Sequence, residues 1–167
     1  MEVVKLSLYE MQSSAHLGIL RCLESIDAEW GYGFKSSLNE KFAKSISGSM
    51  AELACCKFLS TPFQFTCNIG ALPDIVWNNI KIQVRSQLPK KNKKNSLIIR
   101  QNAKPDQIYI LVIDYAPNFH IHGFVNSSNI LNNKNYLTNF GLDRPEVYSV
   151  PIEELTPIKI LKDGAWN

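Results

Sequence analysis

The sequence predicts an α/β fold of the α+β type, in which helices flank the faces of a mixed central β-sheet. Two long helical patterns occupy the N-terminal third of the chain, and short β-rich segments follow after Pro62. The 167 residues, 45% hydrophobic and 20% charged, have the composition of a globular protein with a sizeable core. Neither an internal repeat nor a low-complexity linker interrupts the chain, so residues 1–167 are expected to form a single domain.

The helical part is predicted first. Within residues 6–27, six residues recur at helical spacing: Leu8, Met11, Ala15, Ile19, Leu23 and Ile26. A Gly-rich loop is expected at residues 30–34, and a second helix at residues 38–59. Gly48 and the serines near it are expected to bend or restart this second helix.

The β-rich part is predicted from short apolar segments separated by Pro, Asn and Lys. The segment QIYILVID is almost continuously apolar, which indicates a central strand covered on both faces. A short helix near residues 127–131, an Asn-rich loop and a final turn at IEEL are expected to close the chain. The predicted strands are FQFTCNI (63–69), IKIQVRS (80–86), SLIIR (96–100), QIYILVID (107–114) and FHIHGFV (119–125).

Several classes of protein do not fit the composition. No apolar run approaches the roughly 18 to 20 residues that a membrane-spanning helix needs. The N-terminal stretch MEVVKLSLYEMQSS lacks the basic-then-apolar pattern of a signal peptide, so a cytoplasmic protein with no membrane partner is expected. The net charge of +3 is too small to indicate a nucleic-acid partner by itself.

The cysteine and histidine patterns favour structural roles. No C-x-x-C pair occurs among the cysteines, which are expected to be reduced and mostly buried. His120 and His122 would share one face of a strand and could bind a metal with a third ligand, but no Cys or acid lies at ligand spacing nearby. The four cysteines are Cys22, Cys55, Cys56 and Cys67.

Candidate functional residues lie in the stretch LPDIVWNNIKIQVRS, residues 72–86. Asn78 and Asn79 are typical of a tight turn between two strands, which would bring Asp74 toward the polar face of the second strand. Residues two apart in a strand share a face, so the apolar alternate residues point into a core. The residues that point the other way are Lys81, Gln83 and Arg85.

This layout resembles the PD-(D/E)XK nuclease superfamily, which has an acid on a helix, Pro-Asp at the start of a hairpin and acid-x-Lys on the next strand. Pro73-Asp74 matches the Pro-Asp pair, and Gln83-Val84-Arg85 occupies the place of acid-x-Lys. Glu52, in SGSMAELACCKFL, occupies the place of the helix acid. The resemblance covers residues 38–125, and the tail with its closing VPIEEL is similar to small phage-type members.

The resemblance implies a restriction-endonuclease-like core and Mg²⁺-dependent or Mn²⁺-dependent hydrolysis of DNA, as an endonuclease or exonuclease, leaving a 5′-phosphate and a 3′-hydroxyl. Glu52, Asp74 and Gln83 would hold one or two ions, and Arg85 would bind the attacked phosphate. A glutamine oxygen can ligate a hard cation without adding charge. Arginine stays protonated and cannot activate water as a lysine can, and Lys81 on the same face is the candidate for the missing ammonium group.

A different reading follows from the Gln-x-Arg variant: a catalytically inactive protein of the nuclease fold that binds DNA or inhibits a host protein. Individual residues also have simpler explanations. Glu52 forms an S-x-x-E capping pattern with Ser49, and Asp74 could be a turn residue. Gln83 and Arg85 could belong to a solvated strand face.

A basic run, KIQVRSQLPKKNKK, spans residues 81–94 and contains six positive residues and no acid. It is either a solvated loop or a contact to the DNA backbone. A second Pro-Asp pair, at residues 105–106, is expected to be only a turn into a strand. The richness in Asn, Lys and Ile suits a phage or mobile element, and the oligomeric state stays open, with a homodimer among the alternatives. The predicted DNA-binding residues are Lys81, Lys90, Lys91, Lys93 and Lys94.

Overall fold

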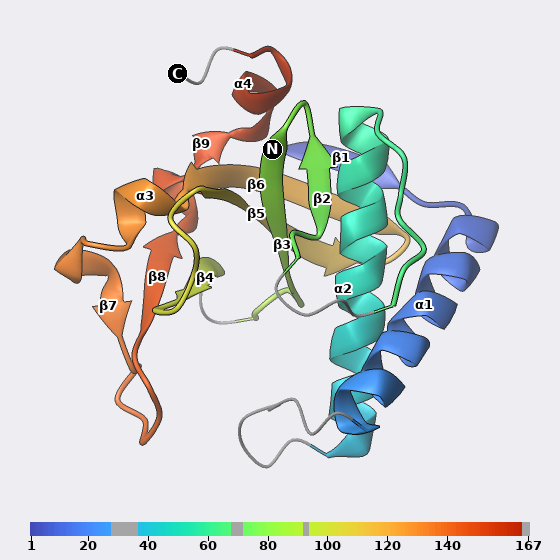
Figure 1. Ribbon diagram of the computed structural model, residues 1–167, viewed down its shortest axis with the longest axis horizontal. Helices are drawn as coiled ribbons and strands as arrows, with labels where there is room; N and C mark the ends of the chain where they lie inside the picture. Colours follow the sequence, from blue (N-terminus) through green and yellow to red (C-terminus); the bar gives the residue numbers. More distant parts are fainter. Residues whose placement is uncertain (28–36, 68–71, 92–93, 165–167) are drawn as a thin grey trace.

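The computed structural model describes residues 1–27, 37–67, 72–91 and 94–164, and it confirms the α+β class (Figure 1). The predicted Gly-rich loop at residues 30–34 lies outside the described residues. The helices are α1 (Leu8–Asp27), α2 (Leu38–Leu59), α3 (Ser127–Ile130) and α4 (Ile158–Lys162), with 3₁₀ turns at Lys134–Tyr136 and Ile152–Glu154. The strands are β1 (Glu2–Lys5), β2 (Ile75–Trp77), β3 (Ile80–Gln87), β4 (Ser96–Arg100), β5 (Gln107–Tyr115), β6 (Asn118–Asn126), β7 (Leu137–Thr138), β8 (Val147–Pro151) and β9 (Thr156–Pro157).

The main sheet is mixed, as predicted. Its strand order is β1-β6-β5-β3-β2, and β9 pairs with β6. β3 and β5 run parallel, with Gln83 opposite Tyr109, whereas the other pairs of this sheet are antiparallel. The segment SLIIR forms β4 but leaves this sheet and joins a second one in the order β4-β8-β7. The strands therefore do not follow one another as a simple meander.

Two apolar cores lie on opposite faces of β5, which is buried along almost its whole length. On one face, α2 and α4 pack against the sheet, with α1 lying against α2 (Figure 1). On the other face, the small sheet and α3 cover the core, which includes Leu97 and Ile99 of β4. The expectation that helices flank both faces is thus correct for one face, while a second sheet dominates the other.

The β2–β3 hairpin forms as predicted. Asn78 and Asn79 have positive φ angles of 47° and 65°, which asparagine tolerates better than most residues and which suits a two-residue hairpin turn. Ile82 and Val84 of β3 are buried in the core under α2. Because side chains alternate along a strand, the polar side chains of β3 project from its other face.

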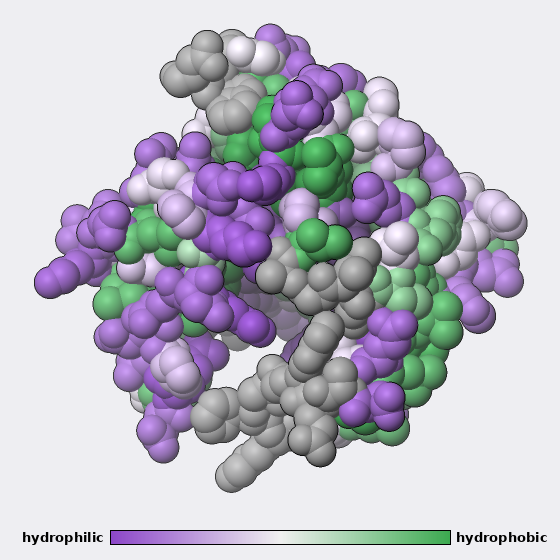
Figure 2. Space-filling view, in the orientation of Figure 1, coloured by the Kyte–Doolittle hydropathy of each residue, from purple (hydrophilic) through white to green (hydrophobic). Residues whose placement is uncertain are grey.

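The helix α1 is confirmed, but the apolar stripe that predicts it faces mostly solvent. Its side chains Ile19, Leu23 and Ile26 are 37%, 49% and 39% exposed, and Figure 2 shows apolar atoms along the outer side of this helix. The buried face is instead formed by small residues and one leucine, because α1 approaches α2 closely. These buried residues are Ser14, Leu17, Gly18, Cys22 and Ser25.

Two helical glycines should respond in opposite ways to alanine substitution. A Cβ at Gly18 would lie 2.7 Å from the Cα of Ile46, whereas a Cβ at Gly48 would meet nothing within 4 Å. Gly18→Ala is expected to lower the free energy of unfolding by roughly 2 kcal/mol through overpacking. Gly48→Ala is expected to raise it by up to about 1 kcal/mol through helix propensity. Urea denaturation of both variants tests this, and equal effects would contradict the packing described.

The helix α2 begins and ends where the sequence predicts, and it is continuous through Gly48. Its capping box is formed by Ser37 and Glu40: the Ser37 side chain accepts from the Glu40 N–H, and the Glu40 side chain accepts from the Ser37 N–H. Ser49 and Glu52 lie in the interior of the helix. The capping explanation for Glu52 is therefore wrong, because its helix starts 15 residues earlier, at Ser37.

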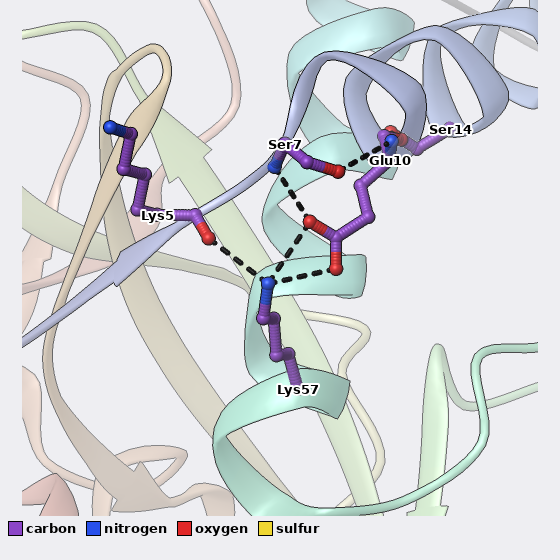
Figure 3. Close-up of polar contacts among 5 residues, drawn as sticks. All are labelled: Lys5, Ser7, Glu10, Ser14 and Lys57. Carbon is purple, nitrogen blue, oxygen red and sulfur yellow. Dashed lines mark hydrogen bonds and ion pairs between the residues drawn. The ribbon is translucent and has the colours of Figure 1, made fainter.

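An ion pair ties β1 and both long helices together (Figure 3). The Lys57 ammonium group of α2 lies 2.8 and 3.0 Å from the Glu10 carboxylate of α1, and it donates to the Lys5 carbonyl at 3.1 Å. Glu10 also accepts the Ser7 N–H at 2.6 Å, as a second capping box. These contacts, led by Lys57, lower the pKa of Glu10 to about 2.

The predicted strand FQFTCNI is wrong over the residues that the structure describes, 63–67, which are irregular. The Phe63 and Phe65 rings pack edge to face, and the Thr66 carbonyl accepts a hydrogen bond from the Arg21 side chain of α1. That backbone group therefore pairs with a side chain and not with a strand. Within the described ranges, no helix is both long and apolar enough to cross a membrane.

Candidate functional site

The two predicted acids, Glu52 and Asp74, come close enough to interact electrostatically. Glu52 lies on the buried side of α2, between Ala51 and the Ala54–Cys56 segment that packs on the sheet. Asp74 lies immediately before β2, at the entry to the hairpin. Both acids line a pocket of about 400 Å³ between the helices and residues 64–67 and 72–76.

Glu52 is nearly buried and paired with an arginine that the motif does not contain. The Arg21 Nη1 atom of α1 lies 2.6 Å from Glu52 Oε2, and the two side chains are 18% and 10% exposed. Burial, and after it the negative charge of Asp74, raise the pKa of Glu52 to about 7. Arg21 opposes this shift but does not cancel it. At neutral pH the carboxyl is therefore poised between its two protonation states.

Asp74 has a structural contact in addition to its place in the site. Its Oδ2 atom accepts the Val84 N–H of β3 at 2.7 Å, so the side chain helps to hold the hairpin in register. Burial raises the pKa of Asp74, while Arg85, the Val84 hydrogen bond and Arg21 oppose the shift. The simpler explanation, that Asp74 is a turn residue, thus accounts for its contact with Val84. It does not account for the effect of Asp74 on the pKa of Glu52.

Gln83 and Arg85 lie on the polar face of β3, as the alternation predicts. The Gln83 amide nitrogen donates to the Leu72 carbonyl at 3.3 Å, which places this side chain beside the segment that carries Asp74. The Arg85 guanidinium lies over the Tyr109 ring, 5.1 Å from its centre. Its positive charge lowers the pKa of both Asp74 and Glu52. Arg85 therefore acts electrostatically on the acid pair.

Lys81 and the lysine loop do not join the acid pair. Lys81 forms an exposed ion pair with Asp106, the acid of the second Pro-Asp, which lies in a turn before β5 as expected. Lys94 forms an exposed ion pair with Glu153. Lys90 and Lys91 are exposed, and Lys93 lies outside the described residues. The ammonium of Lys81 is thus committed to Asp106, so it does not supply the missing lysine of the motif in this structure.

A second cavity of about 1290 Å³ lies between the first half of α2 and the ends of β3 and β4. Arg85 and Lys90 line it, so it connects a residue beside the acids with the start of the basic loop. Lys44 and Arg100 add positive charge, whereas Asp114 accepts a hydrogen bond from Ser47 at 2.7 Å. Glu40 also lines this groove, so its charged groups are of both signs, with the positive ones in excess.

Arg21 is the residue that sequence reasoning missed. It lies 31 positions before Glu52, on a helix outside the region of resemblance. The contact depends on how closely α1 packs on α2, which no motif records. A weak signal existed, because Arg21 lies at helical spacing from Ser14 and Ser25 on the small-residue face of α1.

The donor set fits a hard divalent cation with few protein ligands. Among the residues with a defined position, no three His, Cys, Asp or Glu side chains gather as a metal-binding group. Magnesium is commonly held by only one or two carboxylates, with water and substrate phosphates completing its shell. The negative charge of Asp74, which raises the pKa of Glu52, would be offset by a doubly charged ion. Glu52 and Asp74 therefore suit Mg²⁺ or Mn²⁺, whereas Gln83 does not line their pocket and its amide nitrogen donates to the Leu72 carbonyl.

The remaining candidate metal ligands have other surroundings. All four cysteines are free, and Cys22, Cys55 and Cys56 are buried, as expected. Burial raises the pKa of the Cys56 thiol to about 12, so it is uncharged at neutral pH. His120 and His122 share one face of β6, and the His120 ring lies 4.5 Å from that of Tyr115.

Comparison of the chain with protein-family models, with curated proteins and with solved structures found no match in any of the three. The function has to be inferred from the side chains of the site, because a fold class alone does not define an activity.

Proposed function

We propose that the protein is a nuclease of the restriction-endonuclease type that hydrolyses DNA phosphodiester bonds with Mg²⁺ or Mn²⁺. The observation that carries this proposal is the convergence of Glu52 and Asp74, two acids 22 positions apart in the sequence, beside the β2–β3 hairpin. A carboxylate that raises the pKa of a second, nearly buried acid is typical of groups arranged for chemistry. The excess of positive groups in the second groove, which Arg85 lines, supports a polyanionic substrate.

Each residue has a defined part in this proposal. Glu52 and Asp74 would hold the ion, with the Gln83 oxygen as a neutral ligand. When bound, a divalent ion activates water and neutralises the attacked phosphate. Arg85 would hold a phosphate oxygen, because a guanidinium group donates two parallel hydrogen bonds to such oxygens. Hydrolysis would leave a 5′-phosphate and a 3′-hydroxyl. A phage or mobile-element context remains part of the proposal.

Nicking of supercoiled plasmid tests the activity directly. We expect conversion to open-circle and linear DNA with Mg²⁺ or Mn²⁺ and none with EDTA. Calorimetric titration of each ion should show binding that is lost in Asp74→Asn. If the wild type binds the ions but leaves linear, circular and single-stranded DNA intact, the hydrolytic proposal is wrong.

The second candidate is a protein of the same fold that binds DNA or a host protein without hydrolysing it. The Arg21–Glu52 ion pair favours it, because the guanidinium already neutralises one predicted ligand. This candidate predicts DNA binding, or capture of a host protein, that is independent of divalent ions. The plasmid assay and the ion titration together separate the two candidates.

The basic loop gives a prediction about salt dependence. Lys90→Gln/Lys91→Gln should weaken binding equally for unrelated DNA sequences and reduce the slope of log K against log salt by ~1 to 2, because each phosphate contact contributes about 0.9. Lys81→Gln/Lys94→Gln removes two lysines that already have acidic partners and should change the slope less. Fluorescence anisotropy across a salt series in Ca²⁺ measures both. Identical slopes for both double variants would show that this distinction is wrong.

A further inference from the structure

Arg21 supplies the positive charge that Glu52 faces in this structure. Its Nη1 atom lies 2.6 Å from Glu52 Oε2, and its Nε atom donates to the Thr66 carbonyl at 3.2 Å. The guanidinium is therefore anchored between α1, α2 and the irregular segment that contains Thr66. These contacts fix the planar group in a defined orientation.

Two guanidinium groups already act on the acid pair. Arg21 and Arg85 both lower the pKa of Glu52 and of Asp74. A divalent ion between the carboxyl groups would add two further positive charges. The ion and the Arg21 guanidinium would then compete for the same Glu52 oxygens.

We propose that Arg21 is an exchangeable internal cation: a divalent ion displaces its guanidinium from Glu52, and the released group binds a phosphate oxygen of the substrate. This inference rests on the proposed function and deepens it, because it makes phosphate binding conditional on the ion. A guanidinium matches phosphate geometry as well as it matches a carboxylate, so the same group can serve both partners.

The pocket has room for this movement. Arg21 and Gly48 both line the cavity of about 400 Å³, and the space beside Gly48 is open to at least 4 Å around a Cβ position. Ser49, also in the pocket wall, has a buried hydroxyl with no hydrogen-bond partner in the described part of the chain. The part of the pocket wall formed by Gly48 and Ser49 is thus neither tightly packed nor fully hydrogen-bonded.

The displacement of Arg21 from Glu52 makes the binding of the ion and the binding of the phosphate cooperative. Since the ion frees Arg21 for the phosphate, a bound phosphate must favour ion binding by the same factor. Removing the guanidinium should therefore have two opposite effects. Ion binding should become tighter because its competitor is gone, while ion-dependent phosphate binding should become weaker.

The test is calorimetric titration of Mg²⁺ into the wild type, Arg21→Gln and Arg21→Lys. We expect Arg21→Gln to bind the ion about tenfold more tightly, within the range usual for coupled sites, and Arg21→Lys to stay close to the wild type. Lys57→Met is the control, because it removes a different ion pair between the same two helices and should leave ion affinity unchanged. Unchanged or weaker ion binding by Arg21→Gln overturns the exchange.

A DNA duplex with Ca²⁺ probes the second half of the proposal. The wild type should bind it at least about tenfold more tightly than Arg21→Gln when Ca²⁺ is present, and equally when EDTA is present. An Arg21 effect of the same size in EDTA overturns the conditional role. If Arg21→Gln does not fold, NMR of the Arg21 Nε–H in the wild type decides: it must shift on addition of Mg²⁺, and a constant signal at saturation rules out release.

These outcomes distinguish failure of the Arg21 exchange from failure of the proposed function. Ion binding that disappears in Asp74→Asn but is indifferent to Arg21→Gln leaves the proposed function standing and rejects the exchange. Absence of ion binding in the wild type rejects both.

Discussion

Asp74→Asn is expected to abolish divalent-ion binding and to reduce DNA cleavage at least about 100-fold, while leaving the fold intact. Asparagine keeps an oxygen that can accept the Val84 N–H, so the hairpin contact at 2.7 Å survives. What disappears is the negative charge facing Glu52. Calorimetric ion titration and plasmid nicking measure the two effects, and urea denaturation checks the fold.

Asp106→Asn provides a matched control for this substitution. Asp106 follows a proline just as Asp74 does, but it lies in an exposed turn and pairs with Lys81. Its replacement should leave ion binding and nicking unchanged. Equal losses in the two variants would contradict a specific role for Asp74. Asp74→Ala is a poorer test, since it also leaves the Val84 N–H without its partner, at a cost of roughly 1 to 3 kcal/mol.

Without divalent ions, the protein is expected to lose stability as the pH rises from about 4.5 to about 7. Glu52 has a pKa of about 7 in the folded protein against 4.5 for the free side chain, so in this window the folded state binds more protons than the unfolded one. The decrease in unfolding free energy is at most about 3 kcal/mol, given 1.36 kcal/mol per pKa unit. Glu52→Gln should reduce this decrease, and the part that remains comes from Asp74, whose pKa burial also raises.

Glu10 acts in the opposite direction at lower pH. Its pKa is lowered from 4.5 to about 2, so its stabilising effect is present above pH 4.5 and is lost as the pH falls toward 2. Because this ion pair is partly exposed to solvent, its contribution is no more than about 1 kcal/mol. Lys57→Met should remove that acid-side loss and leave the decrease above pH 4.5 in place. Urea denaturation from pH 2 to 8 measures both, and a decrease of undiminished size in Glu52→Gln would contradict the assignment.

Sequence patterns predicted correctly those elements that depend only on residues close together in the chain. The boundaries of α2, the turn at Asn78 and Asn79, and the buried strand β5 follow from neighbouring residues, and the structure confirms each of them. The strand β1 escaped prediction because its four residues become a strand only by pairing with β6. Likewise β4 looks like a member of the main sheet until its partner β8 is known.

Features that depend on tertiary packing could not be predicted from the sequence patterns. Both sides of α1 carry apolar or small residues, and only the close approach of Gly18 to Ile46 selects the buried side. In the site, the resemblance pointed to Glu52 and Asp74, which do interact, and to Arg85, which lowers the pKa of both. It also pointed to Gln83, whose side chain contacts the Leu72 carbonyl. Arg21 could not be predicted, because its contact with Glu52 exists only once the two helices are packed.

The pairing of β4 with β8 has a consequence for how the chain is made. Ile98 lies opposite Ser149, so this strand pair joins residues about 50 positions apart. During synthesis, Leu97 and Ile99, which are fully buried in the finished fold, leave the ribosome well before the strand that covers them. Until β8 arrives, the nascent chain carries an unpaired apolar strand edge. Ribosome-bound chains that end between β6 and β8 should therefore be the species most prone to aggregation or to capture by chaperones.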